Sequence, residues 1–86
     1  MLKREDFMPI PYLKKAKFTG SYQGMRYRME KVEKEEGETV LRVEAWPEPY
    51  SYDATPKEQV ISQDFEFSEN GIQAGIAWLN ATYGKF

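Results

Sequence analysis

The chain has 86 residues, a net charge of −2 and neither cysteine nor histidine. Thiol nucleophiles, disulfides, imidazole bases and nearly all zinc sites are therefore excluded. The length suits one domain over residues 1–86, and a hydrophobic content of 41% is enough to close one core. No spacing of the remaining carboxylate, hydroxyl and amine groups forms a recognisable active site, so we predict no catalytic residue, metal ligand or cofactor.

Charge is divided unevenly along the chain. Nine Lys and Arg residues stand against four Asp and Glu residues up to Lys34, whereas three stand against ten from Glu35 onward. Such asymmetry can mark an interaction surface. The alternative is that the two halves lie side by side and largely cancel, because one compact core brings them together.

The N-terminal stretch is expected to contain short helical pieces around a Pro-Ile-Pro break, one near Leu2–Phe7 and a turn or short helix over Tyr12–Lys17. Pro9 and Pro11 interrupt the only apolar patch there, and charged residues flank it, so no secretory signal is indicated. The apolar run Ile76–Leu79 is far too short to span a membrane. We therefore expect a cytoplasmic protein without membrane contact.

The middle of the chain predicts strands. Phe18–Lys34 is predicted to be mostly strand, because apolar and charged residues alternate over Met25–Glu30. Thr39–Trp46 is predicted to be a second strand, with Leu41, Val43 and Ala45 on one face. If Tyr27 and Met29 share a face with Val43 and Ala45, the numbers of paired residues must sum to an even value. A two-residue turn at Glu36-Gly37 cannot provide that parity, so we expect an odd-length loop or a bulge between these strands.

The last third predicts a helical turn, a strand and a helix. Thr55-Pro56-Lys57-Glu58 has the pattern of a capped helical turn, and Ile61, Phe65 and Phe67 indicate an apolar strand face. Ser68 is a candidate cap for a helix over Glu69–Tyr83, which Gly84 can terminate. The sequence therefore predicts an α+β fold, in which a three- or four-stranded antiparallel sheet carries the C-terminal helix on one face, beside a short N-terminal helical segment.

The C-terminal helix is apolar on two sides. Ile72, Ile76, Leu79 and Tyr83 form the stripe expected to cover the sheet, and a second apolar side consists of Ala74, Ala77, Trp78 and Ala81. Either the N-terminal segment, with Phe7, Ile10, Tyr12 and Leu13, or a second copy of the chain is expected to cover that second side. The chain is thus expected to be a monomer or a homodimer.

Two groups of residues are candidates for binding. A segment rich in proline and aromatic residues, and one tryptophan of the C-terminal helix, suit an unidentified protein partner. The candidates are Trp46, Pro47, Glu48, Pro49, Tyr50, Tyr52 and Trp78. A basic face is suggested by Arg26, Arg28 and Lys31. Alternation places Tyr27 on the opposite face from both arginines, and the pI is near 5.2, so we do not expect a nucleic-acid partner. The alternative for these bases is a solvated face of cross-strand ion pairs, such as Arg28 or Lys31 with Glu44.

Two turns and one acidic cluster are further candidate sites. Gly20–Gly24 lacks the following helix that a phosphate loop needs, so its glycines are expected to ease a bend or bulge. The glutamates at residues 35–38 are expected to be a solvated turn. Acids and phenols that could bind a ligand or do acid–base work are Glu44, Glu48, Asp53 and Glu58, with Tyr50 and Tyr52.

Several short motifs resemble those of small uncharacterised proteins of anaerobic gut bacteria, often encoded on phages or conjugative elements. The motifs are Phe18–Ser21, Gly24–Arg28, Trp46–Tyr50, Thr55-Pro56, Phe65–Gly71 and Trp78–Asn80. The resemblance implies an accessory protein of a mobile element and no established activity. Some similar proteins are labelled acetyltransferases, but this chain lacks a glycine-rich pyrophosphate loop and is shorter than such a domain.

The favoured hypothesis is a non-enzymatic protein-interaction module. One alternative is an inhibitor of host defence that uses an acidic surface from Glu35 onward to mimic nucleic acid, which requires one contiguous negative surface. Another is a small enzyme or an acetyltransferase-like fragment, which requires a concave pocket lined by Glu44, Asp53, Tyr50 or Tyr52.

Overall fold

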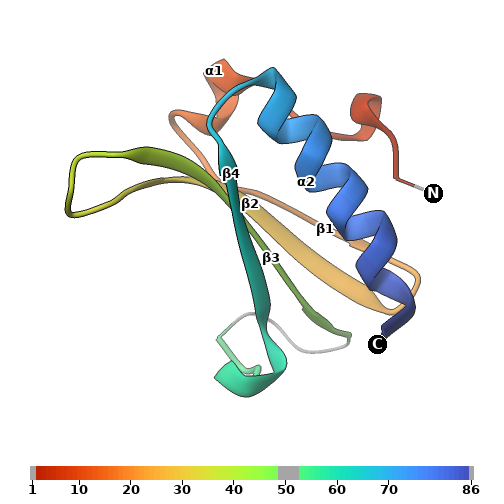
Figure 1. Ribbon diagram of the computed structural model, residues 1–86. Helices are drawn as coiled ribbons and strands as arrows, with labels where there is room; N and C mark the ends of the chain where they lie inside the picture. Colours follow the sequence, from red (N-terminus) through yellow and green to blue (C-terminus); the bar gives the residue numbers. More distant parts are fainter. Residues whose placement is uncertain (1, 49–52, 86) are drawn as a thin grey trace.

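The computed structural model describes residues 2–48 and 53–85. One antiparallel sheet has the order β1 (Phe18–Tyr22), β2 (Met25–Glu33), β3 (Thr39–Pro47) and β4 (Ile61–Glu66), each strand pairing with the next. A single long helix, α2 (Glu69–Thr82), lies across one face of the sheet (Figure 1). The predicted α+β fold is confirmed, and the sheet takes the four-stranded form. We call the face under α2 the inner face and the opposite one the outer face.

A two-residue turn divides the predicted strand over residues 18–34 into β1 and β2. Gln23 and Gly24 both have positive φ, 45° and 88°, as a type I′ hairpin turn requires. Gly24 therefore occupies a turn, whereas Gly20 lies within β1, where the Tyr27 side chain leaves no room for a Cβ. The expected bend or bulge is thus a tight turn at Gly24 and a close side-chain approach at Gly20.

The hairpin between β2 and β3 has the predicted parity. Tyr27 pairs with Ala45 and Met29 with Val43, so the paired numbers sum to an even value. The Lys34 amide donates to the Glu38 carbonyl at 2.7 Å, which closes an odd-length loop, and Gly37 within it has φ +90°. The expected odd-length loop is therefore confirmed.

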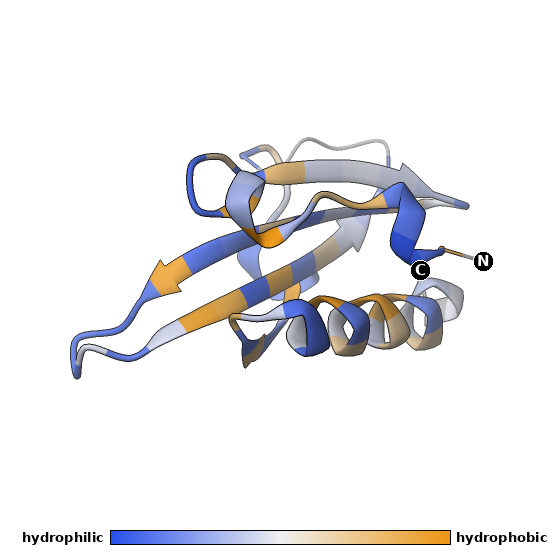
Figure 2. Ribbon diagram, turned by 90° about the horizontal axis from the view of Figure 1, so that it is seen from above, coloured by the Kyte–Doolittle hydropathy of each residue, from blue (hydrophilic) through white to orange (hydrophobic). Residues whose placement is uncertain are grey.

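The core lies between the inner face of the sheet and α2. Figure 2 shows hydrophobic residues alternating with hydrophilic ones along the strands beside the helix. The largest fully buried side chains are Met25, Met29, Leu41, Val43, Ile72 and Leu79. Apolar surface removed from water contributes roughly 25 cal/mol per Å², so this single layer is the main source of stability.

The α2 helix begins as predicted and ends differently. Ser68 caps it by accepting a hydrogen bond from the Gly71 amide at 3.2 Å. The helix ends at Thr82 and continues into a 3₁₀ turn, η3 (Tyr83–Lys85). Gly84 is not in the left-handed conformation, so the expected glycine termination is wrong. The predicted helical turn after Pro56 is present as η2 (Lys57–Gln59), without a side-chain cap.

The N-terminal segment is bound along α2. It contains η1 (Arg4–Asp6), within the stretch predicted to be helical, and α1 (Ile10–Leu13). The α1 turn begins inside the expected Pro-Ile-Pro break and ends before most of Tyr12–Lys17, so the predicted bounds of this second piece are wrong. The Leu2 backbone amide donates to Asn80 Oδ1 at 2.9 Å, and the side-chain Nδ2 of Asn80 donates back to the Leu2 carbonyl at 3.0 Å. Near the other end of the helix, Arg4 donates to both carboxylate oxygens of Glu69, at 2.6 and 2.8 Å. These contacts hold the segment beside the helix.

The segment does not cover the second apolar side of α2. Phe7 and Leu13 join the core, and Phe7 stacks on Tyr27 with ring centroids 5.3 Å apart. Tyr12, expected to help cover the helix, is instead 40% exposed. The alanines that remain exposed on the helix are Ala74, Ala77 and Ala81. The segment therefore completes the core at one end of the sheet rather than shielding the helix.

We predict that Gly71→Ala destabilises the protein by about 3 kcal/mol. A Cβ at position 71 would overlap the Glu66 carbonyl oxygen, so the first turn of α2 would have to move away from β4. Urea unfolding measures the loss. Gly84→Ala is the matched control, because no atom lies within 4 Å of its Cβ position, and it should cost less than about 0.5 kcal/mol. Equal effects of the two substitutions would contradict this packing.

We predict that Arg4→Gln raises the pKa of Glu69. The hydrogen bond from Arg4, and then that from Gln73, lower this pKa from an ordinary 4.5 to about 2. A folded-state pKa that is lowered adds stability above pH 4.5, and this stability is lost as the pH falls from 4.5 toward 2. An NMR titration of the Glu69 carboxyl carbon gives the value. Lys3→Gln removes the same charge nearby and should leave the pKa of Glu69 near 2; a wild-type pKa of 4.5 would contradict the pairing.

Candidate functional site

Trp46 lies on the outer face of β3 and is buried. It pairs in register with Arg26 of β2, and only 3% of its surface is exposed. It stands apart from the core cluster between the sheet and α2. A side chain so little exposed offers almost no area to a partner, so Trp46 does not provide the accessible anchor that the sequence hypothesis needs.

The other predicted partner-binding residues are scattered. Pro47 is half-buried at the end of β3, and Glu48 is exposed, with its amide donating to the Gly24 carbonyl at 2.9 Å. Trp78 is half-buried against Phe65, with ring centroids 6.4 Å apart. The remaining three candidates, Pro49, Tyr50 and Tyr52, lie outside the described residues. The described candidates do not form one surface.

The predicted basic face divides between the two faces of the sheet. Arg26 and Arg28 lie on the outer face, opposite Trp46 and Glu44 of β3. Lys31 pairs with Leu41, so it lies on the inner face, and grouping it with the arginines was wrong. The reason is the period of two along a strand, which sends residues 28 and 31 to opposite sides.

Ion pairs connect the strands across the outer face. Arg28 Nη2 lies 2.6 Å from Glu44 Oε1 and 3.7 Å from Glu30 Oε1. In the next row, Arg42 donates twice to Asp64, at 2.8 and 3.1 Å. The expected cross-strand pair of Arg28 with Glu44 is confirmed, whereas Lys31 pairs with Glu33 of its own strand at 3.3 Å.

These ion pairs shift the pKa values of their members. The hydrogen bonds from Arg42 hold the pKa of Asp64 below its ordinary value, and Lys34, at 3.5 Å, acts in the same direction. The same hydrogen bonds raise the pKa of Arg42. Both groups are therefore held in their charged forms. Positive and negative side chains balance each other on this part of the outer face.

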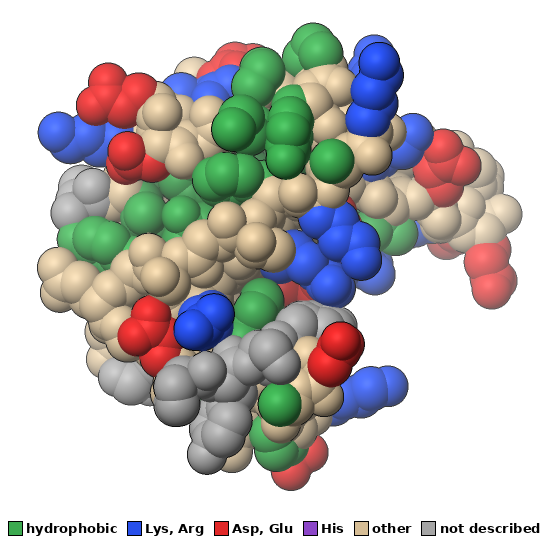
Figure 3. Space-filling model, turned by 180° about the vertical axis from the view of Figure 1, so that it is seen from behind, with side chains coloured by type: hydrophobic (Ala, Val, Ile, Leu, Met, Phe, Trp, Pro, Cys, Tyr) green, Lys and Arg blue, Asp and Glu red, His purple; other side chains and the backbone are tan. Residues whose placement is uncertain are grey.

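The acidic and basic halves of the chain are paired with each other in the fold. Arg4 pairs with Glu69, Arg28 with Glu44, and Lys34 with both Glu38 and Asp64. Figure 3 shows acidic and basic side chains interspersed on the side away from α2. No contiguous negative surface, which nucleic-acid mimicry requires, is seen over the described residues on this side (Figure 3). The observed pairing instead favours the alternative in which the two halves cancel.

A hollow of about 420 Å³ lies at the β4 side of the outer face. Its lining residues are Glu44, Asp53, Thr55, Lys57, Val60 and Ser62. The fold therefore brings together Glu44 and Asp53 of the predicted acidic cluster, whereas Glu48 and Glu58 are exposed and do not line the hollow. Glu44 is itself 7% exposed and already bound to Arg28. Among the residues 2–48 and 53–85, no three acidic side chains are grouped so that they could hold a metal ion.

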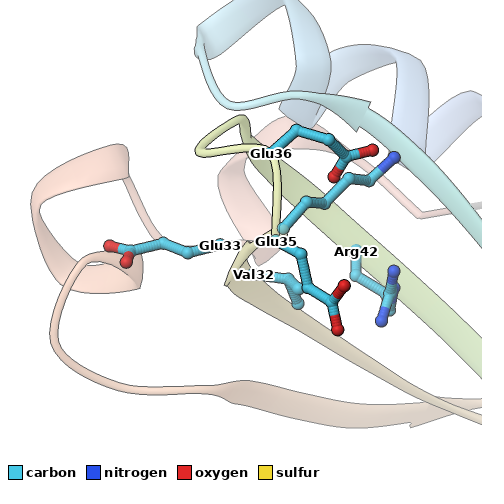
Figure 4. A pocket seen from close by; sticks show the side chains of 6 residues that line it. Val32, Glu33, Glu35, Glu36 and Arg42 are labelled. Carbon is cyan, nitrogen blue, oxygen red and sulfur yellow. The ribbon is translucent and has the colours of Figure 1, made fainter.

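A second, shallower hollow lies at the base of the β2–β3 hairpin (Figure 4). The hollow has a volume of about 660 Å³, and its lining includes Val32, Glu33, Glu35, Glu36 and Arg42. In Figure 4 the Glu33 carboxylate points away from the other labelled side chains. The labelled groups do not converge on one point, as a ligand site requires, and the glutamates of this loop belong to a solvated turn, as expected.

Exposed large apolar side chains occur in the N-terminal segment. Met8 is 38% exposed and Tyr12 40% exposed, and the prolines Pro9 and Pro11 between them are also exposed. Figure 3 shows hydrophobic side chains gathered at the top of the molecule, where α1 lies in Figure 1. Tyr12 was expected to help cover the second apolar side of α2, and the structure leaves it exposed instead. The signal that could have found this surface is the Pro-Ile-Pro break, since one turn of helix buries only one of its sides.

Comparisons with known proteins add no relationship: no protein-family model, no curated protein and no solved structure matches the chain. Among the described residues, no helix is both long and apolar enough to cross a membrane.

We predict that Arg28→Met costs about 3 kcal/mol of stability, because it leaves the nearly buried Glu44 carboxylate without its closest cation. Lys31→Met is the matched control. It removes an ion pair whose members are 31% and 68% exposed, so it should cost less than about 0.5 kcal/mol. Thermal or urea unfolding of both variants checks this difference. An Arg28 variant as stable as the control would contradict a structural role for the pair.

Proposed function

We propose that this protein is a non-enzymatic protein-interaction module that docks through a surface on its N-terminal segment. This docking surface consists of Met8, Pro9, Pro11 and Tyr12. The observation that carries the proposal is the exposure of Met8 and Tyr12, the large hydrophobic side chains left uncovered in the described residues. Apolar groups gathered in one exposed place are typical of protein-binding surfaces, and tyrosine and methionine are enriched in them.

The docking surface is supported from below. The Tyr12 amide donates to the Pro9 carbonyl at 3.0 Å, and Lys14 continues the turn by donating to the Ile10 carbonyl at 3.0 Å. Leu13, in the same turn, is 2% exposed and part of the core. A surface held in this way loses little conformational entropy on binding, which favours affinity.

The charges around the docking surface indicate the kind of partner. Lys14, Lys15 and Lys17 follow it directly and are exposed. Only Lys17 among them lies near an acid, with Nζ 3.9 Å from Glu30. We therefore expect a partner that places apolar side chains on Met8 and Tyr12 and acidic groups toward these lysines. The mobile-element association and the cytoplasmic location remain proposals drawn from the resemblance and the composition.

A second candidate function is a small enzyme, favoured by the hollow at Glu44 and Asp53. This hollow is the concave feature that the enzyme hypothesis requires. Arg28 Nη2 already binds the Glu44 carboxylate, 2.6 Å from Oε1. Asp53 is therefore the acid in the hollow that is better placed to bind a ligand. We rank this candidate second because the two acids do not form a matched acid–base pair.

We predict that the double variant Met8→Ser, Tyr12→Ser loses a protein that the wild type captures from a lysate of the native host. Both side chains are exposed, so the free energy of unfolding of the variant should stay within about 0.5 kcal/mol of the wild-type value. Mass spectrometry of the captured material is the measurement. Ala77→Glu, on the exposed side of α2, is the control and should retain the same protein.

The result that would contradict the proposal is capture that is unchanged in the double variant or abolished only by Ala77→Glu. Trp46→Ala is not a suitable control, although the sequence hypothesis placed the docking site there. Truncating this buried side chain should cost about 3–5 kcal/mol, so lost capture would report unfolding rather than a lost contact.

A further inference from the structure

The open edge of β1 lacks the usual protection of a sheet edge. Its five residues, Phe18–Tyr22, include no charge and no proline. β1 ends the strand order, so no strand among the described residues pairs with its far side. Edge strands are normally protected by charges, prolines or bulges. The other edge strand, β4, has such protection in Asp64 and Glu66. In Figure 3 a band of uncharged atoms runs where β1 lies in Figure 1.

The β1–β2 hairpin determines which backbone groups face this edge. In a hairpin closed by two residues, the residues flanking the turn form a hydrogen-bonded pair, and such pairs alternate along the ladder. Counting from Tyr22 and Met25, the alternation directs the N–H and C=O groups of Thr19 and Ser21 away from β2. The side chains of Thr19 and Ser21 are exposed. The edge therefore presents two residues with the spacing that an added antiparallel strand needs.

We propose that β1 pairs antiparallel with β1 of a second copy of this chain, with Thr19 opposite Ser21 of the second copy and Gly20 at the twofold axis. In this register the outward-facing residues oppose each other and form about four hydrogen bonds. Every contact occurs twice, as a closed dimer requires. The proposal is independent of the N-terminal docking surface.

The same register places compatible side chains across the axis. On the inner face, Phe18 lies opposite Tyr22 of the second copy, an aromatic cross-strand pair. Each ring already packs within its own chain, Phe18 on Phe7 at 5.4 Å and Tyr22 on Tyr83 at 5.0 Å. The basic residue nearest the strand, Lys17, lies opposite Gln23 of the second copy, so like charges do not meet. A second copy therefore fits this edge without the charge conflict that would exclude it.

Amide hydrogen exchange by NMR tests the pairing on the whole chain. We expect exchange at Thr19 and Ser21 to slow as protein concentration rises, together with a shift of the mass in sedimentation from one chain to two. Gly20, bonded to β2 in both states, should be protected throughout. Unchanged exchange at Thr19 and Ser21, with the mass of a single chain at every concentration, would overturn the proposal. Protection that appears only when a different protein is added would also overturn it.

Charge-swap variants test the register. The Thr19→Glu, Ser21→Glu double variant and the Thr19→Lys, Ser21→Lys double variant each place like charges opposite each other, so each should self-associate about tenfold more weakly. An equimolar mixture of the two should associate again. Gln63→Glu, exposed on the other edge strand, is the control and should associate like wild type. Variants that fold, as judged by circular dichroism, and still associate alone would contradict the register.

Discussion

Among the described residues, only one face of this sheet has a long helix to cover it, and the rest of the structure depends on that constraint. Period-two alternation in β2 and β3 sends the large apolar side chains to the inner face, where α2 packs. Most charged residues of the same strands then occupy the outer face. There they are closely packed, with Glu44 at 7% exposure, so each needs a counter-ion nearby. The Arg28–Glu44 and Arg42–Asp64 pairs are the consequence of a one-sided core.

Close contact between helix and sheet is a second consequence of the small core. Gly71 and Gly75 of α2 lie against Glu66 and Val43 respectively, where a Cβ would leave too little room. The helix thereby approaches the sheet closely enough for Ile72 and Leu79 to be fully buried. The N-terminal segment then fills the end of the core with Phe7 and Leu13. Ile10 packs against the edge of this core, whereas Met8, Pro9, Pro11 and Tyr12 have no further core to enter and are exposed.

Much of the fold could be predicted because it follows from local patterns. The alternation of β2 and β3, the parity of their hairpin and the Ser68 cap are each determined by residues close together in sequence. The residues that were placed wrongly depend on distant contacts. Tyr12 was expected to help cover α2 together with Leu13, but the single turn of α1 buries Leu13 and leaves Tyr12 exposed. The burial of Trp46 on the outer face was likewise not predicted, because alternation along β3 says which face a residue lies on and not how deeply it is buried.

The candidate sites were less predictable than the fold, because a site is made of residues that the sequence separates. The sequence grouped Glu44 with Asp53, and the fold does place both at one hollow. It also proposed Trp46 to Tyr52 as a docking segment, whereas the accessible apolar side chains of the described residues lie in the N-terminal segment. We therefore propose that a partner binds the short turn that packs on the core, rather than the end of β3.

The measurement that decides this assignment is a map of backbone amide chemical shifts before and after the captured partner is added. The account predicts that the shifted amides cluster over residues 8–17, while those of Glu44, Asp53 and Ser62 stay in place. Shifts confined to the residues around the outer-face hollow, with none in the N-terminal segment, would contradict it.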